Sequence, residues 1–276
     1  LGDAFTGPIV ITPHNTKWVM LPKGNGLFAF NNGKDIDDES DDQSEKLSLR
    51  VSFPPNGTIK ILNDIYSMAV DLNGSLWIGT SSGAVVYYAP SSVFSASDFY
   101  ASQPSVDQGD TIFHGLLATE IVTAIAVDGA NRKWFGTKNS GAFLTNEDGN
   151  ELIQSFNTTN SPLPSNEIIS IAIDHASGEV YFGTDGGVVS YRSAATRADL
   201  YSGPLYAFPN PVRPGYNGLI TVKGIPAESK VKITDLTGNL VFEGESVGGQ
   251  ITWDGKERSG KPVVSGVYLV FAATTD

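Results

Sequence analysis

Residues 71–80 read Asp-Leu-Asn-Gly-Ser-Leu-Trp-Ile-Gly-Thr, and this stretch decides the fold because it returns along the chain. It returns at 128–137 and at 174–184, and a weaker copy surrounds Trp18. In each copy an apolar segment leads into a polar turn, an aromatic segment follows, and a glycine-containing turn leads to a third segment. Such a self-similar pattern of short strands and turns indicates a repeat architecture.

The spacing of the copies predicts the blades of a β-propeller. The aromatic positions Trp18, Trp77, Trp134 and Tyr181 lie 59, 57 and 47 residues apart, whereas a minimal blade needs about 40–45 residues. The surplus falls in two insertions, at about 33–58 and 90–115. Because a closed propeller has about four to eight blades, we expect roughly four blade repeats that are the C-terminal part of a larger propeller.

The repeated aromatic residues are expected to pack between neighbouring blades. Trp18, Trp77 and Trp134 occupy the same position of their repeats, so an interblade core is a better interpretation than a set of sugar-binding platforms.

The repeated aspartates Asp71, Asp128 and Asp174 raise the question of glycoside cleavage by paired carboxylates. A catalytic pair needs two different environments, which identical repeat positions do not provide. We expect these side chains to accept hydrogen bonds from backbone N–H groups and so to shape hairpin turns.

The pattern changes after Tyr191. Short alternating segments follow between 206 and 276, and about 70 residues of this kind predict a small immunoglobulin-like sandwich. Residues 237–239, Thr-Gly-Asn, are expected to form a hairpin turn within it. The sequence thus divides into propeller blades at 1–195, a linker at 196–205 and an all-β sandwich at 206–276.

Composition and charge exclude several classes of function. The formal net charge of −12 repels phosphate backbones and anionic headgroups, so nucleic acid is not an expected partner. The absence of cysteine removes disulfides, thiolate metal sites and cysteine nucleophiles. No apolar run reaches the roughly 20 residues of a membrane-spanning helix, and the first residues do not read as a signal peptide.

One stretch matches a catalytic motif. Residues 79–83, Gly-Thr-Ser-Ser-Gly, fit the G-x-S-x-G nucleophile elbow. That elbow needs a turn from a strand into a helix, whereas here the turn is expected to join two strands. The other repeats keep the glycines and lose the serine. We therefore expect no catalytic residue, no cofactor and no enzymatic activity.

The first insertion is rich in carboxylates, with seven between 35 and 45. Asp35, Asp37 and Asp41 are weak candidates for a calcium loop, but the spacing does not fit the EF-hand template. The alternative is a solvated insertion, and no metal ligand is assigned. The histidines His14, His114 and His175 show no metal-ligand spacing.

The second insertion holds the candidate ligand-binding residues. Long loops on a rigid propeller often carry binding functions, and simple packing onto the propeller is the alternative. The candidates are Phe94, Phe99, Tyr100, Phe113 and His114.

The blade repeats resemble the two-component-regulator propeller repeat over about residues 8–195. In that family such propellers sense or bind ligands outside the cytoplasmic membrane. The C-terminal segments 208–211, 232–238, 253–255 and 265–270 resemble the type A sorting domain of the type IX secretion system. The family normally adds a last strand after a turn, which would come after Thr274-Thr275-Asp276. The residues that carry the sorting-domain resemblance are Pro209, Asn210, Pro211, Asp235, Gly238, Gly266 and Tyr268.

A propeller joined directly to a sorting domain resembles the PorZ-like proteins of the type IX secretion system. The resemblance implies a non-enzymatic protein of the Bacteroidetes cell surface, exported through the periplasm to the outer membrane. It also implies binding to anionic lipopolysaccharide and to partner proteins of the secretion machinery. Two alternatives stay open: a ligand-sensing extracellular propeller, and the C-terminal part of a secreted type IX cargo enzyme.

Overall fold

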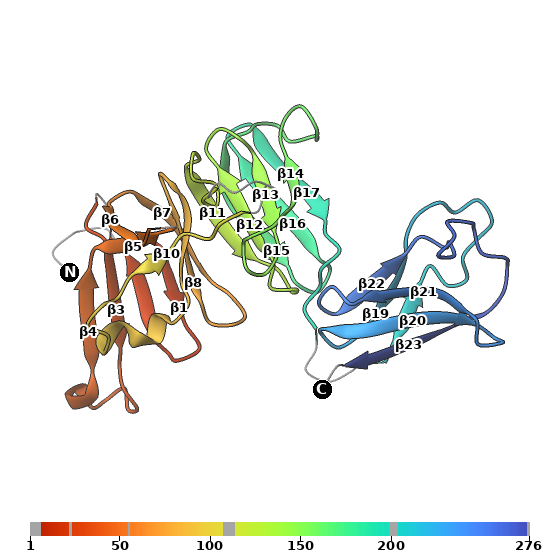
Figure 1. The fold of residues 1–276 in the computed structure, drawn as a ribbon, viewed down its shortest axis with the longest axis horizontal. Coiled ribbons are helices and arrows are strands. Elements are labelled where there is room, and N and C mark those ends of the chain that lie inside the picture. Colours follow the sequence, from red (N-terminus) through yellow and green to blue (C-terminus); the bar gives the residue numbers. More distant parts are fainter. Residues whose placement is uncertain (1–6, 22–23, 55, 107–113, 199–203, 275–276) are drawn as a thin grey trace. The chain divides into compact units, whose positions relative to one another are not determined.

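The structure, a computed structural model, describes residues 7–21, 24–54, 56–106, 114–198 and 204–274. Its described elements are strands and two short 3-10 turns, η1 (Glu39–Asp41) and η2 (Pro90–Phe94). The chain is all-β, with successive propeller-type sheets followed by an immunoglobulin-like sandwich, as the sequence predicted (Figure 1). Within the described residues there is no helix whose length and apolar character would let it cross a membrane.

Blade 1 and blade 3 are four-stranded antiparallel sheets whose strands follow the chain order. Blade 1 contains β1 (Ile9–Ile11), β2 (Lys17–Met20), β3 (Leu27–Asn31) and β4 (Gln43–Leu47). Blade 3 contains β11 (Val122–Val127), β12 (Lys133–Thr137), β13 (Ala142–Thr145) and β14 (Leu152–Phe156).

Blade 2 is a six-stranded sheet in the order β6-β5-β10-β9-β8-β7. Its repeat contributes β7 (Ile65–Val70), β8 (Leu76–Thr80) and β9 (Gly83–Tyr87). The first insertion supplies β5 (Leu49–Phe53), the segment that follows it supplies β6 (Thr58–Leu62), and the second insertion supplies β10 (Ala101–Ser102). Strand β10 pairs parallel with β5 and antiparallel with β9. Both insertions therefore extend sheets, and the first also supplies β4 of blade 1.

Blade 4 contains three strands in chain order, β15 (Ile168–Asp174), β16 (Glu179–Thr184) and β17 (Gly187–Arg192). Figure 1 shows blades 1 to 4 following one another from red to green.

The hydrophobic core of the propeller part lies between successive blades. Trp18 of blade 1 packs with Leu76 and Ile78 of blade 2, and Trp77 of blade 2 packs with Phe135 of blade 3. Trp18, Trp77 and Trp134 are 0%, 1% and 0% exposed, which confirms their predicted interblade position. Burial of such large side chains contributes about 1.5–3 kcal/mol each.

Small residues let the blades approach. A Cβ at Gly79 of β8 would lie 2.4 Å from the carbonyl oxygen of Val122, and one at Gly136 of β12 would lie 2.5 Å from Ile168 Cγ2. These are the glycines of the repeated aromatic strand, so the repeat itself sets the interblade distance.

The sandwich consists of two three-stranded sheets, β18-β19-β22 and β21-β20-β23. Val231, Ile233, Ile251 and Trp253 are at most 5% exposed and belong to its core. The predicted hairpin turn at 237–239 is confirmed between β20 and β21. The strands are β18 (Tyr206–Phe208), β19 (Ile220–Lys223), β20 (Ser229–Asp235), β21 (Leu240–Glu245), β22 (Gln250–Trp253) and β23 (Tyr268–Thr274).

Two compact units make up the chain. The first comprises residues 1–127, 131–172 and 181–190, and the second comprises 128–130, 173–180 and 191–276. Within the second unit Thr196 forms a parallel bridge with Gly248, and its carbonyl oxygen accepts a 2.8 Å hydrogen bond from the Gly249 N–H. The start of the expected linker is therefore paired with the sandwich.

Candidate functional site

A polar network that spans two blades of the first unit is built on the turn that joins β7 to β8. Asp71 Oδ1 accepts hydrogen bonds from the backbone N–H groups of Asn73 (3.0 Å) and Ser75 (2.8 Å). Gly74 takes a φ of +84°, which a side chain would strain. The turn sequence therefore leaves the second carboxylate oxygen of Asp71 free to point at blade 3.

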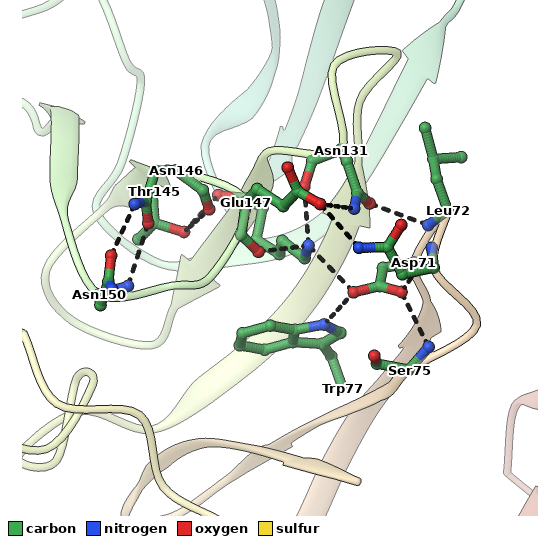
Figure 2. A network of polar contacts seen from close by, with 11 residues as sticks. Asp71, Leu72, Ser75, Trp77, Asn131, Thr145, Asn146, Glu147 and Asn150 are labelled. Atoms are coloured by element: carbon green, nitrogen blue, oxygen red, sulfur yellow. Dashed lines mark hydrogen bonds and ion pairs between the residues drawn. The ribbon is translucent and has the colours of Figure 1, made fainter. Parts of the chain in front are cut away.

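Lys133, the first residue of β12, meets that second oxygen. Its Nζ lies 3.0 Å from Asp71 Oδ2, which also accepts a 2.9 Å hydrogen bond from Trp77 Nε1. The ammonium also lies 5.0 Å from the Trp77 ring centroid, within reach of a cation–π interaction. The side chains of Lys133 and Asp71 are 0% and 4% exposed. A buried charge pair thus joins blade 2 to blade 3 (Figure 2).

The remaining protons of the ammonium are also used. Lys133 Nζ donates to the backbone carbonyl oxygens of Asn131 (2.7 Å) and Glu147 (2.5 Å) of its own blade. Three acceptors therefore match the three N–H bonds of an ammonium. Burial lowers the pKa of Lys133, and the carboxylate of Asp71 opposes this effect.

The side-chain amides of two asparagines, one from each blade, extend the network across blades 2 and 3. Asn131 Oδ1 accepts a 2.9 Å hydrogen bond from the Leu72 N–H. The side-chain amides of Asn73 and Asn131 both donate to Glu147 Oε1, at 2.7 Å and 3.0 Å. Figure 2 shows Asn131 lying between Glu147 of its own blade and Leu72 of blade 2. The network fixes two blades in register, and the three N–H bonds of the Lys133 ammonium are all directed at acceptors of the protein.

The other repeated aspartates have the predicted turn-shaping role. Asp128 Oδ1 accepts from the Ala130 N–H, and Asp174 Oδ1 from the Ala176 N–H, each at 3.0 Å. The expectation that these carboxylates satisfy backbone donors is confirmed at all three positions.

The nucleophile-elbow match lies in a strand-to-strand turn. Strands β8 and β9 pair antiparallel across it. Thr80 Oγ1 donates to the Gly83 carbonyl oxygen at 2.8 Å and accepts from the Ser82 N–H. The equivalent hydroxyls of Thr137 and Thr184 make the same bond to Gly141 and Gly187. The stretch is therefore a repeated turn rather than the helix start that the elbow requires.

The structure separates the aromatic candidates of the second insertion. Phe94 and Phe99 pack against the core between blades 1 and 2. The Phe99 ring stacks on Tyr87 at 4.4 Å between centroids and lies 6.1 Å from Trp18.

The remaining candidates of the second insertion are Tyr100, His114 and Phe113. Tyr100 is 43% exposed, and the His114 carbonyl oxygen accepts a 2.8 Å hydrogen bond from the Val106 N–H. Phe113 lies outside the described residues. Among the four described candidates Tyr100 is the most exposed, whereas Phe94, Phe99 and His114 are partly buried. Burial raises the pKa of the Tyr87 phenol beneath Phe99.

The carboxylates of the first insertion are exposed and bind local backbone groups. Asp35 Oδ1 accepts from the Asp37 N–H at 3.1 Å, and Asp41 Oδ2 from the Lys34 N–H at 2.9 Å. Asp38 caps η1 through the Ser40 N–H. No group of three or more histidine, aspartate or glutamate side chains is placed to hold a metal ion in the part of the chain that the structure describes.

The histidines contribute backbone groups to turns. The His14 carbonyl oxygen accepts from Asn31 Nδ2, and that of His175 accepts from the Arg197 N–H, each at 2.9 Å.

The sorting-domain residues lie in turns and strands of the sandwich. The Phe208–Pro209 and Asn210–Pro211 peptide bonds are cis. Asp235 organises the β20–β21 turn, in which Gly238 takes a φ of +89°.

The end of the motif leads into β23. Gly266 is exposed just before this strand. Tyr268 opens β23, donates to the Val264 carbonyl oxygen at 2.6 Å and packs edge-on against Trp253.

Sequence reasoning missed Lys133, Asn131 and Glu147. A signal was present: Lys133 stands directly before the repeat aromatic, where blades 2 and 4 have Leu76 and Val180. Blade 1 also has a lysine here, Lys17, so the position is apolar in two of the four blades. A lysine at a position that is apolar in other blades indicates a buried charge that needs a partner.

Comparison with solved structures gives a similarity to PorZ, described as an essential bacterial surface component of the type-IX secretion system of human oral-microbiomic Porphyromonas gingivalis. The sequences are 32% identical over 98% of this chain, with a TM-score of 0.66. The PorZ-like resemblance that the motifs predicted is thus confirmed along nearly the whole chain. The chain spans 37% of the length of PorZ.

More distant similarities concern extracellular domains from B. thetaiotaomicron. That of the putative one component system BT4673 is 18% identical over 89% of this chain and 29% of its own, with a TM-score of 0.48. That of the putative hybrid two component system BT3049 is 17% identical over 92% of this chain and 34% of its own, with a TM-score of 0.47. No family model matches the sequence, and no curated protein does.

Proposed function

We propose that this chain is the C-terminal part of a non-enzymatic cell-surface component of the type IX secretion machinery. The supporting observation is the 32% identity to PorZ across 98% of the chain, which includes both the blades and the sandwich. We also propose the division into blades at 1–195, a linker at 196–205 and a sorting-signal sandwich at 206–276. In this proposal the blades are a rigid scaffold, and the sandwich is the export signal and also binds the anionic sugar.

Two features support a binding rather than a catalytic role. The buried lysine between blades 2 and 3 donates all of its protons to fixed acceptors. The repeated aspartates bind their own turns. Neither set of polar groups is arranged to take up or release a proton on a substrate.

Charge distribution suggests where an anionic lipopolysaccharide would bind. Residues 206–276 contain seven basic and seven acidic residues, so the formal net charge of −12 is carried by residues 1–205. An anionic polymer would therefore be repelled by the blades and not by the sandwich. The loop 256–261 holds Lys256, Arg258 and Lys261, all exposed. We propose that this loop contacts the anionic sugar.

Deletion of the gene in its host tests the assignment to the machinery. We expect type IX cargo to accumulate in the periplasm with its signal uncleaved and without lipopolysaccharide attached, which an immunoblot detects. Normal cargo processing would refute this role and favour a cargo protein or a sensor.

Lipopolysaccharide binding is tested separately with the purified full-length protein. Replacing Lys256, Arg258 and Lys261 by glutamate should weaken binding of anionic lipopolysaccharide at least tenfold in a titration, because three attractive charges become repulsive. The matched control replaces the exposed Lys34, Lys46 and Lys60 of the blades by glutamate and should leave binding nearly unchanged. An equal loss in both variants would refute the proposed contact.

A further inference from the structure

Blade 1 repeats the lysine half of the network that joins blades 2 and 3. Lys17 and Lys133 each open the second strand of their blade. Each follows by two positions an asparagine with positive φ, Asn15 at +61° and Asn131 at +57°. The same turn therefore presents a lysine in both blades.

The partner position on the next loop is also repeated. Lys17 pairs with Phe30 and Lys133 with Thr145 across the neighbouring strands, so Asn32 and Glu147 occupy equivalent positions two residues later. Lys17 Nζ donates to Asn32 Oδ1 as Lys133 Nζ donates to the Glu147 carbonyl oxygen.

The asparagine side chain completes the repeated group. Asn15 Nδ2 lies 3.4 Å from Asn32 Oδ1, and Asn131 Nδ2 lies 3.0 Å from Glu147 Oε1. Lysine, asparagine and the loop acceptor thus form the same group of three in blade 1 and blade 3. In blade 3 this group receives Asp71 and the Leu72 N–H from the preceding blade.

On the face of blade 1 that carries Lys17, the apolar side chains of the outer strand β1 are exposed. Residues paired across antiparallel strands share a face, and Ile9 pairs with Val19 and Ile11 with Lys17. Ile9 and Ile11 are 58% and 59% exposed. In blade 3 the corresponding face holds Lys133 and packs against blade 2. We call residues Ile9, Ile11 and Lys17 the open face of blade 1.

The opposite face of blade 4 is exposed in the same way. Tyr181 and Val188 occupy the repeat positions of Trp77 and Ala84. They are 43% and 74% exposed, whereas Trp77 and Ala84 are 1% and 0% exposed. The two ends of the row of blades therefore present the two halves of an interblade interface.

We propose that the open face of blade 1 packs against a further propeller blade of the full-length protein, and that this blade supplies an aspartate to Lys17 from the position of Asp71. Covering a lysine with apolar surface is strongly unfavourable unless a carboxylate pairs with it. The chain spans 37% of PorZ, so a protein of similar length has room for such a blade.

The interface between blades 1 and 2 supports the pairing rule. Blade 2 has Leu76 at the lysine position, and blade 1 has Thr12 at the position of Asp71. The Thr12 hydroxyl bonds to the Thr16 carbonyl oxygen of its own turn. At the third interface Val180 of blade 4 has the lysine position and Asp128 of blade 3 has the Asp71 position, so an aspartate there does not require a lysine. Lys133, the lysine whose neighbouring blade is described, is paired with an aspartate, and we expect the same of Lys17. This inference is independent of the secretion role proposed above.

A photo-crosslinking amino acid at position 11 of the full-length protein tests which segment packs against the open face of blade 1. We expect mass spectrometry to find Ile11 joined to a peptide of the same chain that carries an Asp-x-x-Gly turn. The control places the same group at Ile61, which is 57% exposed on β6, and should give no such product. Isotope-mixed samples separate contacts within one chain from contacts between copies. Crosslinks to a second copy, to another protein or to no peptide would overturn the proposal.

Substitution of Lys17 tests whether its charge is buried and paired with a carboxylate. In the full-length protein Lys17→Met should lower the melting temperature by an amount similar to Lys133→Met. Lys60→Met is the matched control, because Lys60 also lies over a ring, 5.4 Å from the Phe53 centroid, on an exposed strand. A melting temperature of Lys17→Met equal to that of the control would overturn the buried pair.

Discussion

Two turns of this protein have nearly the same sequence and very different surroundings. Residues 71–74 read Asp-Leu-Asn-Gly in blade 2, and residues 235–238 read Asp-Leu-Thr-Gly in the sandwich. In both, the Oδ1 atom of the aspartate accepts from the backbone N–H groups two and four residues later. In both, the glycine takes a positive φ, +84° and +89°.

The second carboxylate oxygen makes the difference. Asp71 is 7% exposed, and its Oδ2 binds Trp77 Nε1 and the Lys133 ammonium. Asp235 is partly exposed, and its Oδ2 accepts from Asn239 Nδ2 at 2.9 Å. Hydrogen bonds from Thr237 and Asn239 lower the pKa of Asp235 to about 2. One local motif can therefore be either a solvent-accessible turn or half of a buried interface.

The largest expected effect is the loss of the buried carboxylate. Asp71→Ala leaves the Lys133 ammonium buried without its counter-charge, which should lower the free energy of unfolding by about 3–5 kcal/mol. Guanidinium denaturation followed by tryptophan fluorescence measures this loss. Asp235→Ala in the matching turn is the control and should show a much smaller loss.

A double substitution sharpens this result. Asp71→Leu with Lys133→Leu removes both charges together, and similar pairs replaced by apolar residues are often neutral. The double variant should therefore be more stable than Asp71→Ala. If it were equally unstable, the cost would come from the turn and not from the unpaired lysine.

Removing the cation should have the next largest effect. Lys133→Met leaves Asp71 with Trp77 Nε1 and two backbone donors, so less charge is left unpaired than in Asp71→Ala. We expect a loss of about 2–3 kcal/mol in the same denaturation experiment. A loss greater than that of Asp71→Ala would contradict the assignment of Asp71 as the better satisfied partner.

Replacing the two turn glycines should lower the free energy of unfolding by similar amounts, because both turns have the same local geometry. These losses should be smaller than those of the Asp71 and Lys133 variants. Gly74→Ala and Gly238→Ala should each lower the free energy of unfolding by about 1–2 kcal/mol. The loss at Gly74 should be slightly larger, since its Cβ would lie 3.3 Å from the Pro13 ring while nothing lies within 4 Å at Gly238. Full tolerance at either site would show that the two turns are not equivalent.

The smallest effect is the pH dependence of the solvent-accessible turn. The pKa of Asp235 is about 2 in the folded state against an ordinary value of 3.8. Its contribution to stability is therefore complete above about pH 4 and is lost as the pH falls towards 2. Hydrogen exchange of the β20–β21 hairpin, compared between wild type and Asp235→Asn, should give a difference at pH 5 that shrinks at pH 2.5. A difference that does not change with pH would contradict this reading.

Much of the fold was predictable from local sequence. The recurring aromatic and glycine positions predicted the blades, and Trp77 and Gly79 do face the next blade. The strands within the insertions were not predicted, because β5 and β10 pair with each other from positions about 50 residues apart. Pairing partners so distant leave no periodic signal in either segment.

The candidate binding residues were less predictable. The aromatic residues of the second insertion do suit a ligand, but Phe94 and Phe99 pack against the core. Sequence gives the residue type at such positions, whereas exposure depends on how the insertion folds back.

The sequence by itself determined the turns, the repeat and the PorZ-like order of modules, because each depends on neighbours a few residues apart. Backbone φ at Gly74 and Gly238 and the hydrogen bonds of Asp71 and Asp235 follow from four-residue motifs. Only the tertiary structure decided that Asp71 meets Lys133, 62 positions further along the chain, and is buried by it. Desolvation and charge pairing depend on which residues pack nearby in space. A local motif does not specify those residues.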